Sequence, residues 1–502
     1  MTFYELLLLF PISITLLAVL IFSRFLAAPS SPKKPLPPGP KPWPIVGNLP
    51  HIGKKPHVSL QKFSSLYGRD LISLRLGSQL LIVASSPAAA AEILKKHDRL
   101  LSARYVPRAL PYDTAELDRK AVAWASNCND QWKAFKAMLR NHIASARAIE
   151  SQAAVRERKV SEMVEFLEGK LGESVCIGEV VFAVIFDSMS NLIFSRDYIG
   201  FERNATANRV KSLIRRLMEL DASPNLADFF PVLKNLDPQG LRRESIRRCN
   251  ELHSLTQPVI KERRECQERP GAKDFLDILL ENGLDDDQID WLSLELFSAG
   301  TDTNTSTIEW AMAELIRNKG AMNKLREELK RELLPPISGK PLIDESTVAR
   351  LPYLNAIVKE TLRLHPPAAL LAPHRASEAC EVMNYTIPKG AQIAVNLWAI
   401  GRDSMVWEDD PGMFKPERFI GSKVDFRGQD FELLSFGAGR RMCPGMPLAA
   451  RQIPLVLAAL VHIFDWRLPN GEDPMKLDMS ERFGFTLQKE LPLVVIPSRS
   501  SF

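Results

Sequence analysis

The sequence predicts a mainly α-helical fold with small β-sheets, preceded by one N-terminal transmembrane helix. Long amphipathic stretches, a few short alternating segments and an uncharged apolar N-terminal run support this fold class. The chain has 502 residues, 45% hydrophobic and 25% charged, which is enough to bury an extensive core. Length alone suggests three domains, but no linker or change in composition follows residue 50. We therefore expect one large folded unit.

The N-terminal segment predicts a membrane anchor. Leu6–Ser23 carries no charge and is close to the ~20 residues needed to cross a bilayer. A cleaved signal peptide is the competing interpretation, because residues 26–28 (Leu-Ala-Ala) resemble a cleavage site. Against a signal peptide, the residues before the long apolar run include Glu5 and contain no lysine or arginine. Arg24 and Lys33 follow the run, so the rest of the chain is expected in the cytosol.

A proline-rich segment separates this anchor from the rest of the chain. Pro35–Pro40 reads Pro-Leu-Pro-Pro-Gly-Pro, a composition that forms a stiff, extended spacer. We predict a membrane anchor at residues 1–28, a hinge at 29–50 and the folded unit at 51–502. An uncleaved anchor of this kind predicts a single-pass protein of the endoplasmic reticulum membrane.

The next segments alternate between short strands and long helices. Leu71–Ser86 predicts a hairpin around Gly77-Ser78, and a helix rich in alanine should start at Ser86-Pro87. Helices are predicted from their apolar periodicity at Arg147–Lys170, Leu241–Arg269, Asp287–Arg317, Ala321–Leu334 and Tyr353–Leu364. Further strands are predicted from short apolar runs at Ala369–Leu371, Gln392–Val395 and Leu491–Ile496.

Phe436–Gly445, with the sequence Phe-Gly-Ala-Gly-Arg-Arg-Met-Cys-Pro-Gly, is the most informative segment. A lone cysteine is usually a small buried hydrophobe, but Cys443 lies among glycines, arginines and prolines. Pro447 is suited to the first turn of a following helix, whose N-terminus should favour the thiolate. A thiolate in a loop, with Arg441 two residues upstream, is suited to axial ligation of a haem iron.

A second motif combines acidic and basic residues near the end of a helix. Glu360 and Arg363 lie three residues apart and share one helix face. Such a pair is usually a surface ion pair. Here leucines flank it and His365-Pro366-Pro367 ends the helix. Arg418, in Phe-Lys-Pro-Glu-Arg-Phe some fifty residues later, is a second arginine within reach of a carboxylate.

The third motif, Ala299–Asn304 (Ala-Gly-Thr-Asp-Thr-Asn), lies in the middle of the long helical run Asp287–Arg317. Glycine, threonine and asparagine are poor helix formers, so we expect the helix to be locally opened here. The alternative is a polar stripe on an ordinary helix.

The spacing Phe-x-x-Gly-x-Arg-x-Cys-x-Gly resembles the haem-binding loop of cytochromes P450, with all five fixed positions filled, and the similarity extends over essentially the whole chain. The resemblance implies the cytochrome P450 fold, haem b as cofactor and Cys443 as its iron ligand. It also implies a buried ion network of Glu360, Arg363 and Arg418. Asp302 and Thr303 would be the acid–alcohol pair that delivers protons to dioxygen. Asn304 departs from the family pattern, which more often has Thr or Ser.

Other haem contacts follow from position. Trp132 and Lys136 lie four residues apart on a predicted helix, so both could reach a haem propionate. The family usually has Arg where this chain has Lys136, which loses the bidentate fork, and Trp132 could instead be a core residue. The remaining residues predicted to contact haem are Ala299, His374, Phe436, Gly437 and Arg441.

Several less specific segments resemble plant alkaloid-pathway members of the same family. That group includes N-methylcoclaurine 3′-hydroxylases, corytuberine-forming phenol-coupling enzymes, bisbenzylisoquinoline-forming enzymes and littorine mutase. The segments are Lys41–Leu49, Leu101–Val106, Ile149–Gln152, Met383–Pro388 and Phe485–Glu490. The resemblance implies oxidation of a benzylisoquinoline-type or related alkaloid by hydroxylation or C–C coupling. Alternatives are oxidative rearrangement of a tropane alkaloid, a haem-thiolate isomerase that needs no reductase, and a non-catalytic haem binder. The isomerase and the haem binder would not need Asp302-Thr303.

The expected partners are an NADPH–cytochrome P450 reductase, a small apolar or alkaloid substrate and the membrane. Nucleic acid is not expected, because a net charge of +5 is modest for this length. The six cysteines show no disulfide or metal spacing, which fits a reducing compartment. The sequence contains neither Cys-x-x-Cys nor His-x-x-x-His, so zinc is not expected.

Overall fold

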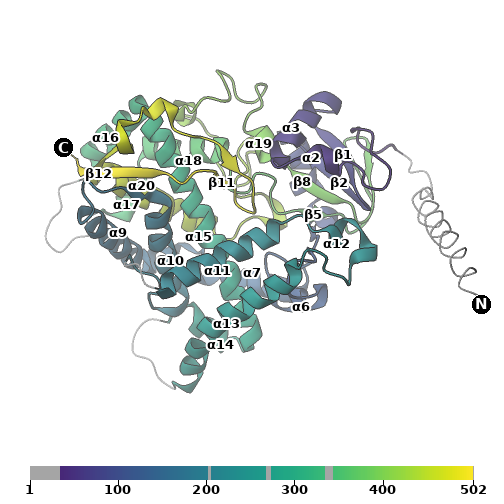
Figure 1. The fold of residues 1–502 in the computed structure, drawn as a ribbon, viewed down its shortest axis with the longest axis horizontal. Coiled ribbons are helices and arrows are strands. Elements are labelled where there is room, and N and C mark those ends of the chain that lie inside the picture. The colour runs from purple at the N-terminus through teal and green to yellow at the C-terminus, as the bar shows by residue number, and fades with distance from the viewer. Residues whose placement is uncertain (1–33, 202–204, 267–272, 334–342, 501–502) are drawn as a thin grey trace, which may run out of the picture.

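The computed structural model describes residues 34–201, 205–266, 273–333 and 343–500. Helices fill most of the molecule, and the largest sheet lies at one end of it, beside α2 and α3 (Figure 1). The predicted mainly α-helical fold with small sheets is therefore confirmed. The predicted anchor at residues 1–28 lies outside the described residues.

The helices divide around α15 (Asp286–Arg317), which crosses the middle of the fold (Figure 1). Those that precede it are α2 (Leu49–Ile52), α3 (Pro56–Tyr67), α4 (Pro87–Ala91), α5 (Asp98–Leu101), α6 (Thr114–Lys120), α7 (Asp130–His142), α8 (Ala146–Ser151), α9 (Ala153–Glu168), α10 (Ile177–Phe194), α11 (Ala205–Ala222), α12 (Leu226–Phe229), α13 (Leu241–Glu265) and α14 (Phe275–Glu281). Those that follow are α16 (Lys319–Glu332), α17 (Glu345–Val348), α18 (Pro352–Leu364), α19 (Leu397–Ile400) and α20 (Met446–Ile463).

In the described residues the strands form one five-stranded sheet and three smaller ones. The large sheet has the order β1-β2-β8-β5-β3, in which β2 and β8 are parallel and the other pairs antiparallel. Its strands are β1 (Leu71–Leu76), β2 (Gln79–Ala84), β3 (Ala103–Arg104), β5 (His374–Arg375) and β8 (Gln392–Val395). The smaller sheets pair β4 (Val175–Cys176), β12 (Val494–Arg499) and β9 (Phe464–Arg467), then β10 (Glu481–Arg482) with β11 (Gln488–Lys489), and β6 (Cys380–Val382) with β7 (Tyr385–Ile387).

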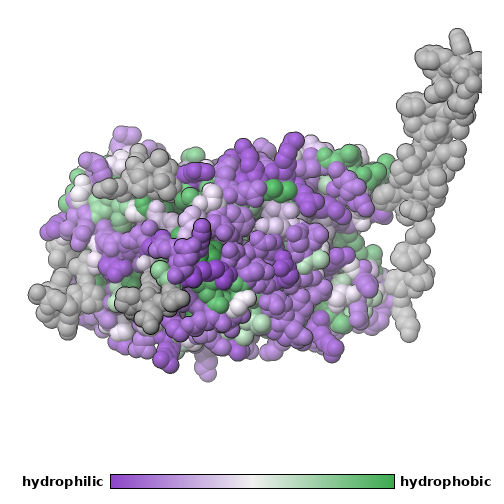
Figure 2. Space-filling view, turned by 90° about the horizontal axis from the view of Figure 1, so that it is seen from below, coloured by the Kyte–Doolittle hydropathy of each residue, from purple (hydrophilic) through white to green (hydrophobic). Residues whose placement is uncertain are grey.

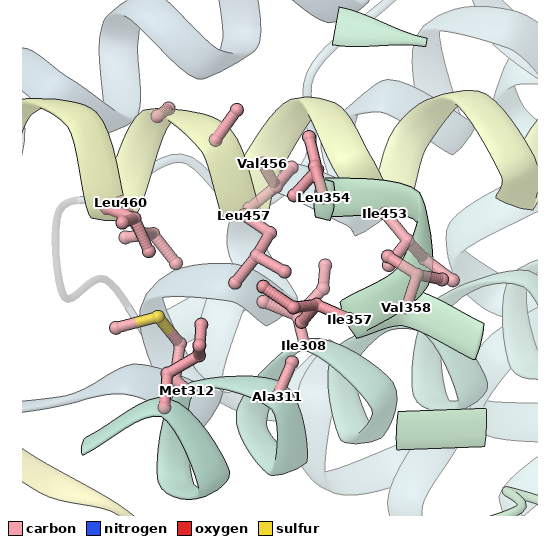
Figure 3. Packing of buried hydrophobic residues seen from close by; sticks show 14 of the residues in the cluster. Ile308, Ala311, Met312, Leu354, Ile357, Val358, Ile453, Val456, Leu457 and Leu460 are labelled. Carbon is pink, nitrogen blue, oxygen red and sulfur yellow. The ribbon is translucent and has the colours of Figure 1, made fainter. Parts of the chain in front are cut away.

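The main core lies where α15, α18 and α20 pack together. Figure 3 shows Ile308 and Met312 of α15 facing Ile357 of α18 and Leu457 and Leu460 of α20. These side chains are almost completely buried. Burial of one such side chain stabilises a fold by about 1.5–3 kcal/mol. This packing fixes α15, which carries the Ala299–Asn304 motif, against the helix that follows Cys443.

Most predicted elements occur where the sequence placed them. The hairpin forms from β1 and β2, and Leu241–Arg269 becomes α13, which ends at Glu265. The predicted helix Arg147–Lys170 is divided between α8 and α9 at Gln152. The prediction of a strand at Ala369–Leu371 was wrong. Prolines flank this segment, and the Leu371 N–H donates to the Ala368 carbonyl at 2.9 Å in a turn.

The prediction that α15 is locally opened was also wrong, because Asp286–Arg317 is α-helical without interruption. Thr303 and Asn304 instead donate side-chain hydrogen bonds to the Ala299 and Gly300 carbonyls one turn earlier, both at 2.7 Å. A Cβ at position 300 would lie 2.9 Å from the Met189 side chain of α10. Gly300 therefore permits close packing of two helices.

The segment that follows the predicted anchor is bonded to two of the sheets. The Ser73 N–H of β1 donates to Pro38 at 2.9 Å, and the Thr386 N–H of β7 donates to Pro35 at 2.9 Å. Two described helices, α10 and α20, are long and apolar enough to cross a membrane, but most of each is buried inside the fold. The face in Figure 2 is mostly hydrophilic with separate hydrophobic patches.

Candidate active site

A cavity of about 260 Å³ lies between α15, α7, the 122–123 segment, residues 367–374 and the Phe436–Pro444 loop. Cys443 faces it from the loop, while Ala299 and Thr303 face it from α15. Most of the remaining lining is apolar and includes Leu94, Leu139, Leu292, Leu296, Leu362 and Leu371. The fold therefore brings together two motifs that lie about 140 positions apart in the sequence.

The loop that carries Cys443 is held by its own backbone. The Cys443 N–H donates to the Phe436 carbonyl at 2.9 Å. Gly439 has φ +70, and a Cβ there would lie 2.1 Å from the Leu94 carbonyl oxygen, so only glycine fits. Pro447 occupies the first turn of α20, as the sequence predicted, and Cys443 lies just before this helix.

Two opposing effects act on the Cys443 thiol. Burial raises its pKa, while the backbone N–H groups of Gly445 and Met446 and the charge of Lys136 lower it. Burial is the largest of these effects, although the Cys443 side chain is open to the cavity, and the helix N-terminus opposes it as the sequence predicted. A coordinating metal deprotonates a thiol, which would supply the missing stabilisation of the charged form.

Arg441 lies within the loop and points away from Cys443 toward the segment before α7. Its guanidinium donates to the carbonyls of Ser102 at 2.9 Å, Val122 at 3.2 Å and Ala125 at 2.8 Å. Among the described residues it forms no ion pair with a carboxylate. Arg441 is therefore a largely buried cation that is solvated by backbone carbonyls and lines the cavity.

Arg104, on β3, is a second cation in the cavity wall, and the sequence did not identify it as a site residue. It is 7% exposed and donates to the carbonyls of Ala372 at 2.5 Å and Ala123 at 3.3 Å. Burial, together with the nearby Arg441, lowers the pKa of Arg104 to about 9. The sequence did contain a clue to Arg104, because this residue lies in one of the segments that carried the family resemblance. Its proximity to Arg441 depends on the fold.

His374, Trp132 and Lys136 also line the cavity. His374 donates from Nδ1 to the Leu101 carbonyl at 2.8 Å, and burial followed by the charge of Arg104 lowers its pKa well below the usual value. Trp132 donates from its indole to the Val122 carbonyl at 3.0 Å. Lys136 Nζ donates to the Arg440 and Met442 carbonyls of the loop. The structure therefore gathers these three predicted haem contacts around Arg441.

These residues fit a haem. One wall supplies a thiol, the sides are apolar, and Arg104 and Arg441 lie together with no carboxylate partner among the described residues. Buried cations without a carboxylate are costly, and two carboxylate groups would relieve that cost. Haem b carries two propionates, an apolar macrocycle and an iron that takes axial ligands. Phe436 and Gly437 line the cavity next to Cys443, as predicted.

The two side chains of the predicted acid–alcohol pair, Asp302 and Thr303, do not face the same space in the structure. Thr303 lines the cavity, but Asp302, 4% exposed, is not part of its wall. Asp302 accepts from Gln488 Nε2 at 2.8 Å, and burial raises its pKa. Asn304 lines the cavity as well. The hydroxyl of Thr303 is thus available to a bound molecule, whereas the carboxyl of Asp302 reaches the C-terminal segment on another side of the helix.

The predicted ion network behind the loop forms as expected. Glu360 accepts from Arg363 through both carboxylate oxygens at 2.7 Å, and Arg418 lies 3.5 Å from the same carboxylate. The Glu360 and Arg363 side chains are fully buried. Arg363 also donates to the carbonyls of Pro411 at 2.7 Å and Met413 at 3.1 Å. The network connects α18 to the segment that precedes Arg418.

Comparison with known protein families decides the assignment, because the family described as Cytochrome P450 matches residues 37–495. The chain belongs to the cytochrome P450 family. Members bind haem b through a cysteine thiolate and act as oxidoreductases of the monooxygenase type with redox partners such as a reductase. The haem and enzyme class that the sequence resemblance implied are therefore confirmed.

Individual cytochromes P450 are similar to this chain over nearly its full length. A probable (S)-N-methylcoclaurine 3′-hydroxylase isozyme 2 of Coptis japonica is 48% identical, covering 97% of each chain. Corytuberine synthase of Coptis japonica is 41% identical, covering 92% of this chain and 94% of its own. Geraniol 8-hydroxylase of Catharanthus roseus is 41% identical, covering 97% and 99%. The alkaloid-pathway resemblance is thus confirmed, and a relative named for a monoterpene alcohol is also among these proteins.

Proposed function

We propose that this cytochrome P450 oxidises a plant alkaloid of the benzylisoquinoline type, by aromatic hydroxylation or oxidative C–C phenol coupling. The observation that carries the proposal is the cavity in which Cys443 and Thr303 face the same space. The names of the N-methylcoclaurine hydroxylase and corytuberine synthase relatives support the alkaloid class. Haem, when bound, supplies the dioxygen and electron-transfer chemistry, and the electron donation of Cys443 favours O–O cleavage.

The residues of the chain then have distinct roles. We assign Cys443 as the residue that would bind the haem iron. Arg104, Arg441, Lys136, Trp132 and His374 form the group that would hold the propionates. The apolar walls exclude water and orient the substrate, so which reaction occurs depends on how the rings are held. Thr303 holds a hydroxyl in the cavity where a proton can be passed on.

In this scheme Asp302 does not contact the bound molecule directly, because its carboxyl lies outside the cavity wall. A raised pKa favours the protonated acid, and rotation of its side chain away from Gln488 would be needed to pass a proton toward Thr303. We therefore assign Asp302 as the proton source behind the hydroxyl. The reductase-independent isomerase alternative is less favoured, because such an enzyme does not need a hydroxyl relay.

We also propose the cellular setting. Residues 1–28 form a single-pass anchor in the endoplasmic reticulum membrane, the catalytic unit faces the cytosol, and an NADPH–cytochrome P450 reductase is the electron donor. Deleting residues 1–28 should release much of the protein from membranes with its haem retained. A truncated protein that enters the secretory lumen and is glycosylated would contradict this topology.

The function is tested by turnover with NADPH and a plant reductase against a panel of benzylisoquinoline and tropane alkaloids and geraniol. We expect oxygen-dependent hydroxylated or coupled products from benzylisoquinolines. Product only from geraniol, or rearrangement without NADPH, would overturn the proposal.

Removal of the Thr303 hydroxyl tests the proton path. Thr303→Ala should still bind substrate but form far less product per NADPH consumed, with peroxide released instead. A positioned acid–base group typically contributes ~10²–10⁴-fold in rate, although water can replace part of it. Thr305→Ala is the matched control, because its buried hydroxyl lies on the same helix and does not line the cavity. Equal coupling in both variants would place the relay elsewhere.

A further inference from the structure

One acidic side chain lies in the cavity wall among the described lining residues, and it is Glu295 of α15. It precedes Thr303 by eight residues, roughly 12 Å along a helix that rises 1.5 Å per residue. Apolar Leu292, Leu296 and Ala299 surround it on the same helix and line the same cavity. Glu295 is therefore an acidic group in an otherwise mainly apolar part of the wall.

The contacts of Glu295 are all with neutral donors. Its carboxylate accepts from the backbone N–H groups of Val122 at 2.8 Å, Ala123 at 3.1 Å and Trp124 at 3.3 Å. It also accepts from the Trp291 indole at 3.2 Å. No ion pair joins Glu295 to a lysine, arginine or histidine in the part of the chain that is described. These donors orient the carboxylate, while burial raises its pKa. The positive charges that act on it are those of Arg104 and Arg441, neither of which forms an ion pair with it.

A second carboxyl group, that of Asp221, lies beside Glu295 but outside the cavity wall. Asp221, near the end of α11, hydrogen-bonds the indole of Trp124, whose backbone N–H is bound to Glu295. Burial, then the charge of Glu295, raises the pKa of Asp221 to about 8, so Asp221 is mostly protonated at neutral pH and would ionise when a cation enters. Two neighbouring carboxyl groups in a poorly solvated place favour the entry of a cation.

Arg104 and Arg441, the cations of the cavity wall, would not balance the charge of Glu295 once haem is bound. Arg104 and Arg441 hydrogen-bond carbonyl groups, and in our assignment they hold the two haem propionates. Arg104 and Arg441 also act on Glu295 through space, and pairing with the propionates would leave Glu295 with less compensating positive charge. A ligand that brings a positive charge into this part of the cavity would supply it, and an amine lying in an apolar cavity is then bound by a desolvated charge pair.

We propose that Glu295, with Asp221 beside it, binds the protonated amine of the substrate and selects nitrogen bases over neutral ligands of similar size. This inference rests on the proposed function and deepens it, because benzylisoquinoline alkaloids such as N-methylcoclaurine carry a basic nitrogen. Geraniol, for which another relative is named, has no such group. The carboxylate thus orients the substrate, with the amine toward Glu295 and a ring toward Thr303.

The test is a substrate-binding titration that follows the haem absorption shift of the purified holoprotein, with no turnover required. The ligands are N-methylcoclaurine and its neutral N-acyl analogue. We expect Glu295→Gln to raise the Kd of the amine by tenfold or more and that of the amide by no more than about twofold. Glu295→Asp keeps the charge and should retain most of the preference. Asp221→Asn should show a smaller loss in the same direction.

The matched control is Glu309→Gln, which removes an acidic group from the same helix. Glu309 accepts from the Leu493 backbone N–H at 2.9 Å and does not line the cavity, so both ligands should bind as in the wild type. Equal weakening of amine and amide in Glu295→Gln would mean that Glu295 only positions residues 122–124, and unchanged binding of both would mean that it contacts no ligand. Either result overturns the inference.

The outcome is separable from that of the proposed function. If the wild type oxidises alkaloids but Glu295→Gln binds amine and amide as before, the function stands and the inference fails. If the wild type binds the amine more tightly than the amide through Glu295 but oxidises neither, the inference stands and the function fails. A wild type that binds no amine contradicts both.

Discussion

Two groups of buried arginines in this protein differ in which group supplies the opposite charge. Arg363 and Arg418 share Glu360, a carboxylate from the chain itself. Within the described part of the chain, Arg104 and Arg441 hydrogen-bond only backbone carbonyls, and both line the cavity. Both groups place positive charge in a poorly solvated environment, but only the first gains an ion-paired carboxylate by folding alone.

The difference separates a structural device from a binding site. A buried ion network with its own counter-charge fixes local geometry, here between α18 and the segment before Arg418. Buried cations without a counter-charge are instead a feature that a ligand with negative groups would complete. In a cytochrome P450 the haem propionates are such groups. The two groups should therefore respond in opposite ways to substitution, one through folding and the other through haem.

The largest effect should follow loss of the internal counter-charge. Glu360→Gln leaves Arg363 and Arg418 buried without a carboxylate, and breaking a buried ion pair costs about 3–5 kcal/mol. We expect a greatly lowered yield of folded protein and a lower denaturation midpoint by circular dichroism of the holoprotein. Glu168→Gln, which breaks the exposed pair with Arg499, should change stability by no more than ~1 kcal/mol. Similar stability of the two variants would refute a structural role for the network.

An intermediate effect should follow removal of a cation from the cavity. Arg104→Gln should weaken haem binding by about 2 kcal/mol or more, mostly through faster release, with little change in the helical circular dichroism signal. The measurement is the rate of haem transfer to an excess of a haem-free globin. Arg104→Lys keeps the charge and should fall between this variant and the wild type. If Arg104→Gln were destabilised as much as Glu360→Gln but kept its haem, Arg104 would have a structural role and not a haem-binding one.

The smallest effect should follow Lys136→Arg. Lys136 contributes one positive charge and donates to the Arg440 and Met442 carbonyls. Arginine keeps the charge and restores the bidentate fork. We expect slower haem release by an amount within the range of one hydrogen bond, about 0.5–1.5 kcal/mol. The same transfer assay measures it, and faster release than in the wild type would argue against a propionate contact at this position.

Much of the fold followed from local patterns in the sequence. The hairpin β1–β2 and helix α18 were predicted because turn residues and prolines mark their ends. The failures have local causes too. Ala369–Leu371 is not a strand. Leu371 is apolar because it lines the cavity and packs on the sheet, and Ala369 because it is buried in a cluster with Trp398 and Leu487. The predicted opening near Gly300 did not occur, since Thr303 and Asn304 satisfy their side chains on the same helix.

The predictions of site residues also succeeded where the signal was local in the sequence and failed where it was not. Cys443 and Thr303 were predicted from motifs whose residues are close in sequence, and the structure brings them to one cavity. Arg104 and Glu295 were missed because their significance depends on what lies opposite them across the fold. An arginine beside Arg441 and a carboxylate bound to residues 122–124 are long-range relations that no local pattern records. Asp302 was predicted beside Thr303, yet neighbouring residues on a helix point to different sides.

The carbon monoxide difference spectrum of reduced wild type and Cys443→Ala, compared at equal haem content, tests the central claim most directly. The account predicts a thiolate-type Soret band in the wild type and its complete loss in the variant, together with all turnover, because Cys443 is the assigned source of the thiolate. Cys128→Ala, which changes another cysteine near Arg441 and Lys136, should keep the band. A thiolate-type band that persists in Cys443→Ala would contradict the account.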